Sequence, residues 1–222
     1  MASPGTSAKR PYAPRMSPAQ RREQLLDTAL RIINTEGVAG VSVDAVAKAA
    51  GVTRPVVYGQ FTDTSHILRD LLAREGERAL AQITDTLPAD LADADPLDTF
   101  THVAESFFTA VTTHPDRWRA ILLPVDATPP PVRSYRQQAE TAIRAQFAEI
   151  TRHFLAGRPG AETVDVDLLA HLLLTAMEEG GRLALAAPDT YPPERLTAMA
   201  RFMVETFFAR YTATAKRDGR RV

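Results

Sequence analysis

Residues 42–61 constrain the fold more than any other part of the chain, because they place two short helices on either side of a glycine turn. Ser42 is a helix-capping residue, and the apolar positions that follow it keep a helical period: Val43, Val46, Ala47 and Ala50. Gly51 tolerates the left-handed conformation that ends helices, and Thr53 then caps a second helix over 54–61. Two short helices joined by about four residues predict a helix-turn-helix.

The rest of the chain carries the same 3.6-residue period, and strand signals are almost absent, so the fold is predicted to be all-α. Ser17 caps the first helix, with Gln20 completing a capping box. The other predicted helices cover residues 18–36, 63–83, 96–111, 115–123, 132–156, 165–187 and 193–215. Two proline-bearing segments, 86–95 and 124–131, are predicted to be a linker and an extended loop.

Charge is spread unevenly along the 222 residues, although the net charge is only −1. Residues 1–62 carry eight basic and four acidic side chains, a net charge of +4, whereas the other 160 residues carry 18 basic and 23 acidic groups, a net charge of −5. A basic N-terminal part on an acidic body is expected where only one end of a protein meets a polyanion.

Several classes of protein are excluded or disfavoured by what the sequence lacks. The chain has no cysteine, which excludes disulfides, thiolate zinc sites and cysteine nucleophiles. No apolar run approaches the ~20 residues that span a bilayer, and residues 1–16 lack the apolar centre of a signal peptide. We therefore expect a cytoplasmic protein with no membrane partner and a disordered basic arm over 1–16.

Catalytic and metal-binding patterns are also missing. No nucleophile–base pair, glycine-rich phosphate loop or metal-ligand spacing is visible, so no enzyme activity and no cofactor are predicted. His102 with Glu105 and His171 with Asp167 are isolated pairs that arise often by chance, and no metal site is predicted from them.

The second helix of a helix-turn-helix enters the major groove, with its first residues closest to the base edges. Arg54 can donate two hydrogen bonds to guanine, worth ~1–3 kcal/mol of discrimination. Tyr58 can reach a phosphate or a thymine methyl, while Val57 and Phe61 are expected to point to the core. The predicted DNA contacts are Ser42, Lys48, Thr53, Arg54, Pro55, Tyr58 and Gly59. Arg21 and Arg22 are interpreted as a solvated face, and Lys48 is balanced between phosphate contact and solvation.

At residues 40–61 the chain resembles the tetracycline-repressor (TetR) family of bacterial transcription regulators, on the run GVSVDAVAKAAGVTRPVVYGQF. The resemblance covers about residues 17–72. Two positions depart from the family pattern: Pro55 replaces a small residue, and Thr64 replaces a common lysine, which removes one expected phosphate contact. We hypothesise that Lys9, Arg10 and Arg15 of the arm compensate by following the minor groove.

The resemblance implies that the C-terminal helices form an effector pocket and a dimer interface. The candidate pocket residues are Phe100, Phe107, Phe108, Trp118, Leu122, Tyr135, Gln146, Phe147, Met177 and Glu178. Core packing is the alternative interpretation of each apolar one. Glu178 can instead pair along its helix with Arg182, four residues on. Broad apolar faces on the last two helices indicate a four-helix interface between two copies, with candidates Leu172, Leu183, Met199, Phe202, Met203 and Phe207.

The sequence therefore predicts a helix-turn-helix DNA-binding domain over 17–62, followed by a helical-bundle effector-binding and dimerisation domain over 63–222, in which 63–84 form a connecting helix. The expected function is that of a homodimeric transcriptional regulator, a repressor that a small-molecule effector releases from a palindromic DNA operator. Two alternatives stay open. One is a helical enzyme or small-molecule carrier with a helix-turn-helix-like start, and the other is a structural DNA-coating protein without a ligand cavity.

Overall fold

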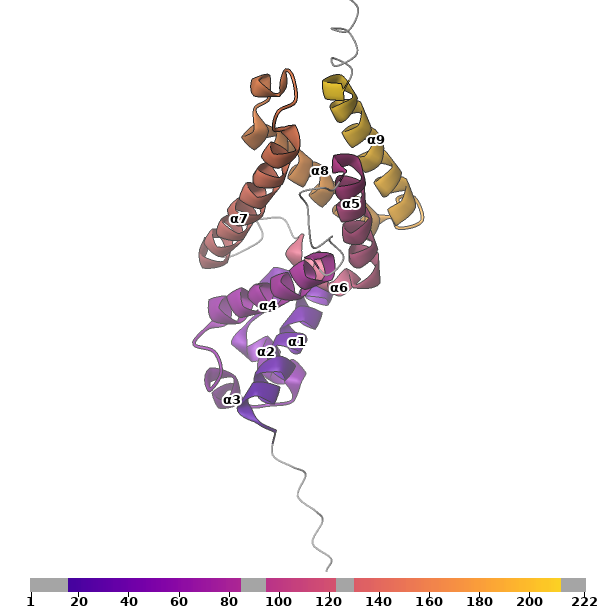
Figure 1. Ribbon diagram of the computed structural model, residues 1–222. Helices are drawn as coiled ribbons and strands as arrows, with labels where there is room; N and C mark the ends of the chain where they lie inside the picture. The colour runs from indigo at the N-terminus through magenta and orange to yellow at the C-terminus, as the bar shows by residue number, and fades with distance from the viewer. Residues whose placement is uncertain (1–15, 85–94, 123–129, 213–222) are drawn as a thin grey trace, which may run out of the picture.

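The computed structural model describes residues 16–84, 95–122 and 130–212, and all regular structure in these ranges is helical, as predicted. The α-helices are α1 (Pro18–Glu36), α2 (Val43–Ala50), α3 (Arg54–Tyr58), α4 (Thr64–Thr84), α5 (Pro96–Thr113), α6 (Pro115–Ile121), α7 (Pro130–Leu155), α8 (Val166–Ala186) and α9 (Pro193–Thr212). Short 3₁₀ turns form at Val38–Gly40 and Ala161–Thr163. Helices α1–α3 gather at one end of the molecule and α5 and α7–α9 at the other (Figure 1).

The start of α1 forms the predicted capping box. The Ser17 hydroxyl accepts a hydrogen bond from the Gln20 backbone N–H at 3.2 Å, and the Gln20 side chain accepts from the Ser17 N–H at 2.9 Å. Pro18 occupies the first turn, where its missing N–H costs nothing. Gly37 ends the helix with φ 77°, a backbone conformation that favours glycine.

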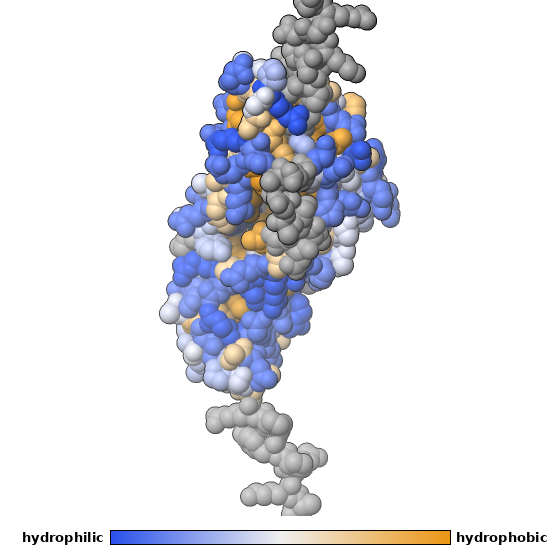
Figure 2. All heavy atoms as spheres, in the orientation of Figure 1, coloured by the Kyte–Doolittle hydropathy of each residue, from blue (hydrophilic) through white to orange (hydrophobic). Residues whose placement is uncertain are grey.

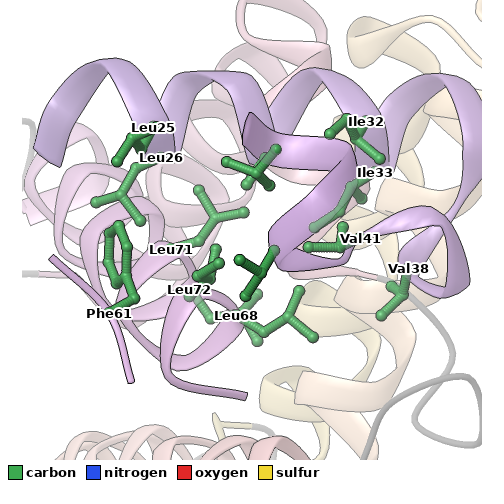
Figure 3. Close-up of a cluster of buried hydrophobic side chains, with 14 of the residues drawn as sticks. Leu25, Leu26, Ile32, Ile33, Val38, Val41, Phe61, Leu68, Leu71 and Leu72 are labelled. Atoms are coloured by element: carbon green, nitrogen blue, oxygen red, sulfur yellow. The ribbon is translucent and has the colours of Figure 1, made fainter. Parts of the chain in front are cut away.

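The helix-turn-helix end has its own core, in which α1, α2 and α4 direct apolar side chains toward one another (Figure 3). Val57 and Phe61 are buried in this core, as the sequence analysis expected. The interpretation of Arg22 as a solvated residue is wrong. Its guanidinium lies 4.6 Å from the centre of the Phe61 ring, donates to the Gln60 carbonyl at 2.8 Å and pairs with Asp70. Arg22 therefore ties α1 to α4.

Helices α4 and α6 belong to both ends of the molecule. Leu68 and Leu71 in the first half of α4 lie in the helix-turn-helix core, whereas Ala79 in the second half packs with α5 and α6. In α6, Ala120 is buried in the helix-turn-helix core and Trp118 packs against Phe107 of α5, with ring centres 4.9 Å apart. The predicted domain boundary at residue 62 thus falls just before a helix that the two ends share.

The other end of the molecule is built on α5, which packs against α8 and α9, while α7 packs along α8. Gly180 and Gly181 of α8 permit a close approach to α5. A Cβ on Gly180 would lie 2.8 Å from the Phe108 ring, and one on Gly181 would lie 3.1 Å from the Phe107 ring.

Some predicted boundaries need correction. Helix α3 ends at Tyr58 rather than residue 61, and Thr53 holds the N-cap position without a side-chain hydrogen bond to the helix. The loop predicted over 124–131 is wrong at its end, because α7 begins at Pro130. Prolines are tolerated in the first turn of a helix, so they start α7 instead of preventing it. The predicted arm up to residue 15, most of the linker and the rest of this loop lie outside the described residues.

Candidate DNA-binding face and ligand cavity

The turn between α2 and α3 is fixed by local hydrogen bonds. The Ser42 hydroxyl accepts from the Ala45 backbone N–H at 3.0 Å and caps α2 as predicted. Gly51 ends α2 in the left-handed conformation, with φ 67°, and the Val52 N–H donates to the Ala47 carbonyl at 3.0 Å. These bonds hold the start of α3 at a set angle to α2.

Helix α3 presents one exposed face. Of the predicted DNA contacts, Thr53, Arg54, Pro55, Tyr58 and Gly59 are all exposed there, and Tyr58 exposes half of its surface. Lys48 is exposed in the last turn of α2, and Ser42 is half-buried by its capping role. Sequence analysis missed Val56, which is 37% exposed on the same face and offers a methyl surface for a thymine. Its exposure could have been predicted from the sequence, because neighbouring positions of a helix point in different directions and Val57 was expected to face the core.

Arg54 is paired across the turn. Its Nε lies 2.8 Å from Oδ1 of Asp44 in the first turn of α2, and both side chains are more than half exposed. An exposed pair of this kind contributes only about 0–1 kcal/mol to folding. The contact therefore does little for stability, and it places the guanidinium beside Asp44 on the exposed face.

The start of α4 borders this face and carries a charged cap. Oδ1 of Asp63 accepts the His66 backbone N–H at 2.8 Å. That hydrogen bond is the main cause that lowers the pKa of Asp63 below its ordinary value, and desolvation acts in the opposite direction. His66 also lies edge-on to the Phe61 ring, with centres 5.5 Å apart, so the cap fixes α4 against the residue that closes the helix-turn-helix.

A cavity of about 230 Å³ lies between α4, α5, α6, α7 and α8. Hydrophobic residues show at the centre of the face in Figure 2, between the two ends of the molecule. Most of the residues that line the cavity are apolar or glycine. Three polar side chains also reach its wall: Thr99, Gln146 and Glu178. A concave, mainly apolar site with a few polar groups is typical of small-molecule binding.

Eight of the ten predicted pocket residues line this cavity: Phe100, Phe107, Trp118, Leu122, Gln146, Phe147, Met177 and Glu178. Two do not. Phe108 faces Gly180 in the core between α5 and α8, and Tyr135 packs against the helix-turn-helix core. No residue of α4 was among the predicted pocket residues, but this helix also supplies part of the lining: Gly76, Ala79, Leu80 and Ile83.

Charged side chains gather beside Glu178. Arg182 donates to Glu178 at 3.2 Å, the pairing along α8 considered from the sequence, and its Nε donates to the Leu122 carbonyl at 3.1 Å. Arg136 of α7 is almost buried. Desolvation lowers its pKa below the ordinary value, while Glu140 and Glu178 act in the opposite direction. The polar end of the cavity is therefore an ionic cluster rather than a single charge.

A buried carboxylate joins the cavity wall to the helix-turn-helix end. Glu75 of α4 is only 1% exposed, and its oxygens lie 2.9 Å from Nε of Arg117 in α6 and 2.8 Å from Arg74. Arg74 in turn lies 2.9 Å from Glu23 and from Asp27 of α1. Burial lowers the pKa of Arg74, but these carboxylates outweigh it and leave the value raised. The network links α1, α4 and α6 immediately beside Gly76 of the cavity.

The predicted dimer residues divide into two groups. Leu172, Met199, Phe202 and Met203 are exposed on α8 and α9, and Leu168 beside them is exposed as well. Leu183 is half-buried, and Phe207 packs against an internal cluster that contains Phe154. The exposed group forms an apolar surface that a single copy leaves uncovered.

Among the described residues, no three His, Asp or Glu side chains gather as metal ligands. None of the described helices is long and apolar enough to cross a membrane.

Comparison with known proteins agrees with this geometry. Residues 25–71 match the family model described as bacterial regulatory proteins, tetR family. The HTH-type transcriptional regulator EthR of Mycolicibacterium smegmatis is 28% identical over 190 residues, which cover 83% of this chain and 84% of that protein. Residues 25–71 therefore form a helix-turn-helix of the tetR family. The HTH-type transcriptional regulator AcrR of Shigella flexneri is 40% identical over 52 residues, but these cover only 24% of that protein.

Solved structures extend the likeness of fold to most of the chain. A TetR-like transcriptional regulator from Rhodococcus sp. RHA1 superposes with a TM-score of 0.68 at 20% identity, over 89% of this chain and 99% of the other. A tetR family regulator from Shewanella sp. PV-4 gives 0.68 at 18% identity, over 83% and 95%. The protein is a helix-turn-helix transcriptional regulator, and the family match at residues 25–71 falls on α1–α3 and the start of α4.

Proposed function

We propose that this tetR-family regulator is a homodimeric repressor that binds a palindromic operator in the cytoplasm and is released by a small apolar ligand. One observation carries the proposal. The same two helices, α4 and α6, contribute to the helix-turn-helix core and to the wall of the ligand cavity. A ligand that alters the wall therefore acts directly on elements that hold α3.

The exposed apolar surface on α8 and α9 supports the dimer. Phe202 is 62% exposed, and Leu172 and Met199 are 56% exposed. Large apolar side chains that are exposed on neighbouring turns of a helix are typical of a protein–protein interface. A two-fold pairing of α8 and α9 would place two copies of α3 on one side of a duplex, where they can read half-sites about 34 Å apart.

The switch follows from where the ligand would sit. Gly76, Ala79 and Ile83 of α4 line the cavity, and Leu68 and Leu71 of the same helix hold the helix-turn-helix core. A ligand that needs a different tilt of α4 binds the DNA-free arrangement more tightly, and by linkage it lowers the affinity for the operator.

The cavity lining selects the kind of ligand. Its volume lies below the ~300–1,000 Å³ of most ligand pockets, so a compact molecule fits best. Apolar walls favour an apolar body, and the Gln146 amide with the Glu178 carboxylate offers partners for a single polar group.

A displacement experiment tests the proposal. Fluorescence anisotropy of the protein bound to labelled DNA from upstream of its gene would be followed during titration with compact apolar compounds. We expect a subset of compounds to release the DNA in a saturable way. Release by no compound, with DNA binding intact, would contradict the effector part of the proposal.

Two variants in α7 test whether the release of DNA depends on ligand binding in the cavity. Ile143 lines the cavity and is 39% exposed, so Ile143→Trp fills space with little strain on the core. Ala145 is exposed on the same helix and does not line the cavity, so Ala145→Trp is the matched control. The first variant should lose the response to ligand while keeping DNA affinity, and the second should behave as the unmodified protein.

A further inference from the structure

The contact between Asp44 and Arg54 joins the first turn of α2 to the first residue of α3. The two residues are separated by ten positions in the sequence, and the turn between them is held by the cap at Ser42 and by Gly51. The pair is therefore part of the helix-turn-helix geometry rather than a contact along one helix.

The atoms used in this pair leave the rest of the guanidinium available. The Arg54 Nε lies 2.8 Å from Oδ1 of Asp44 as an ion pair, and within the described ranges the structure gives the two terminal nitrogens of Arg54 no protein partner. Guanine presents two acceptors, O6 and N7, to a pair of arginine N–H donors. An ion pair made through Nε leaves the two terminal nitrogens able to act as such a pair.

The pair contributes little to stability, because both side chains are largely exposed, Arg54 by 58% and Asp44 by 65%. A carboxylate beside a DNA-reading helix also repels phosphates, which weakens binding to every sequence equally. A gain in discrimination between base pairs would offset that loss of affinity. Fixing a long, flexible side chain before binding reduces the entropy lost when that side chain contacts a base.

We propose that Asp44 is a specificity-determining residue that positions Arg54 to read one guanine in each half-site. Asp44 acts through Arg54 and does not itself need to touch the DNA. It reduces overall affinity for DNA and increases the preference for guanine at the base pair that Arg54 contacts. This inference rests on the DNA-binding role of the family and not on the ligand cavity.

The test compares operator variants that differ at single base pairs, with Kd measured by anisotropy for Arg54→Ala, Asp44→Ala, Asp44→Asn and the double variant Asp44→Ala with Arg54→Ala. Arg54→Ala should remove the guanine preference at one base pair of each half-site, a loss of about 5- to 150-fold. Asp44→Ala should reduce the same preference at least threefold and bind scrambled DNA more tightly. The double variant should be no less selective than Arg54→Ala alone.

Asp44→Asn separates positioning from charge, since the asparagine oxygen can still accept from Nε. It should keep a clearly higher guanine preference than Asp44→Ala, although both variants lose the same charge from the first turn of α2 and should show the same small change in Tm. Glu77→Ala, which removes an exposed acid from α4, is the control for net charge and should leave the preference unchanged.

The proposal is overturned if Asp44→Ala leaves the guanine preference intact. It is also overturned if that variant changes the preference at a different base pair from Arg54→Ala, because Asp44 would then read DNA by itself. Absence of any sequence preference in the unmodified protein would instead contradict operator recognition as a whole, so the two failures are distinguishable.

Discussion

Two glycines in helix interiors respond oppositely to the same substitution, because only one of them has a close neighbour. By helix propensity alone, Gly→Ala stabilises a helix by about 1 kcal/mol at either site. A Cβ on Gly76 would meet nothing within 4 Å, whereas a Cβ on Gly180 would lie 2.8 and 2.9 Å from two atoms of the Phe108 ring. That ring is buried, with the Phe107 ring centre 5.2 Å away, so it has little room to move.

The magnitudes follow from these contacts. Forcing an additional methyl group into a packed core costs about 1–3 kcal/mol, which offsets or exceeds the gain in helix propensity at Gly180. We expect Gly76→Ala to raise the free energy of unfolding by about 0.5–1 kcal/mol and Gly180→Ala to lower it by up to about 2 kcal/mol.

Thermal unfolding at one fixed protein concentration, by circular dichroism, measures this difference. A chain of this size shifts Tm by about 2–4 °C for each kcal/mol, so the two variants should separate clearly and in opposite directions. Equal stabilisation by both substitutions would refute the close approach of α8 to α5. Gly76→Ala also adds a methyl group to the cavity wall, so it should weaken ligand binding while Gly180→Ala acts through stability alone.

Three further predictions concern charge and assembly. Glu75→Ala should lower the free energy of unfolding by about 3–5 kcal/mol in urea, because it leaves Arg117 without its buried partner; a loss below 1 kcal/mol would contradict the network. Asp63→Ala should cost about 1 kcal/mol at neutral pH by removing the cap on His66. Because the pKa of Asp63 is lowered on folding, this loss is full above the ordinary value of 3.8 and should fade as the pH falls through the lower folded value in acid denaturation series. Phe202→Glu should convert the dimer to a monomer in sedimentation, and an unchanged mass would exclude the proposed interface.

The sequence was sufficient where structure depends on neighbouring residues. Ser17 and Ser42 cap their helices as predicted, and Gly37 and Gly51 end them, because capping and left-handed turns are decided within a few positions. Helix α3 is shorter than its pattern indicated. Its last apolar residue, Phe61, is placed by the core and by a hydrogen bond from its N–H to the Val57 carbonyl, not by a continuing helix.

The sequence was insufficient where side chains from distant elements meet. Arg22 and Arg54 both precede apolar helical patterns, yet one is held against Phe61 by Asp70 and the other lies exposed beside Asp44. The cavity likewise requires α4 and α7 to face one another, and this packing cannot be predicted from the local sequence of either helix. The aromatic and polar residues on the inner helix faces allowed most of the cavity lining to be predicted. The same pattern could not show that Phe108 packs in the core instead of lining the cavity.

The central claim, sequence-specific DNA recognition by a dimer through α3, is tested most directly by a mobility shift with DNA from upstream of the protein's own gene. The account predicts one discrete complex that contains two copies of the chain per site. Arg54→Ala and Tyr58→Phe should weaken it, and its affinity should fall steeply as salt rises. Equal affinity for scrambled DNA of the same length would contradict the account.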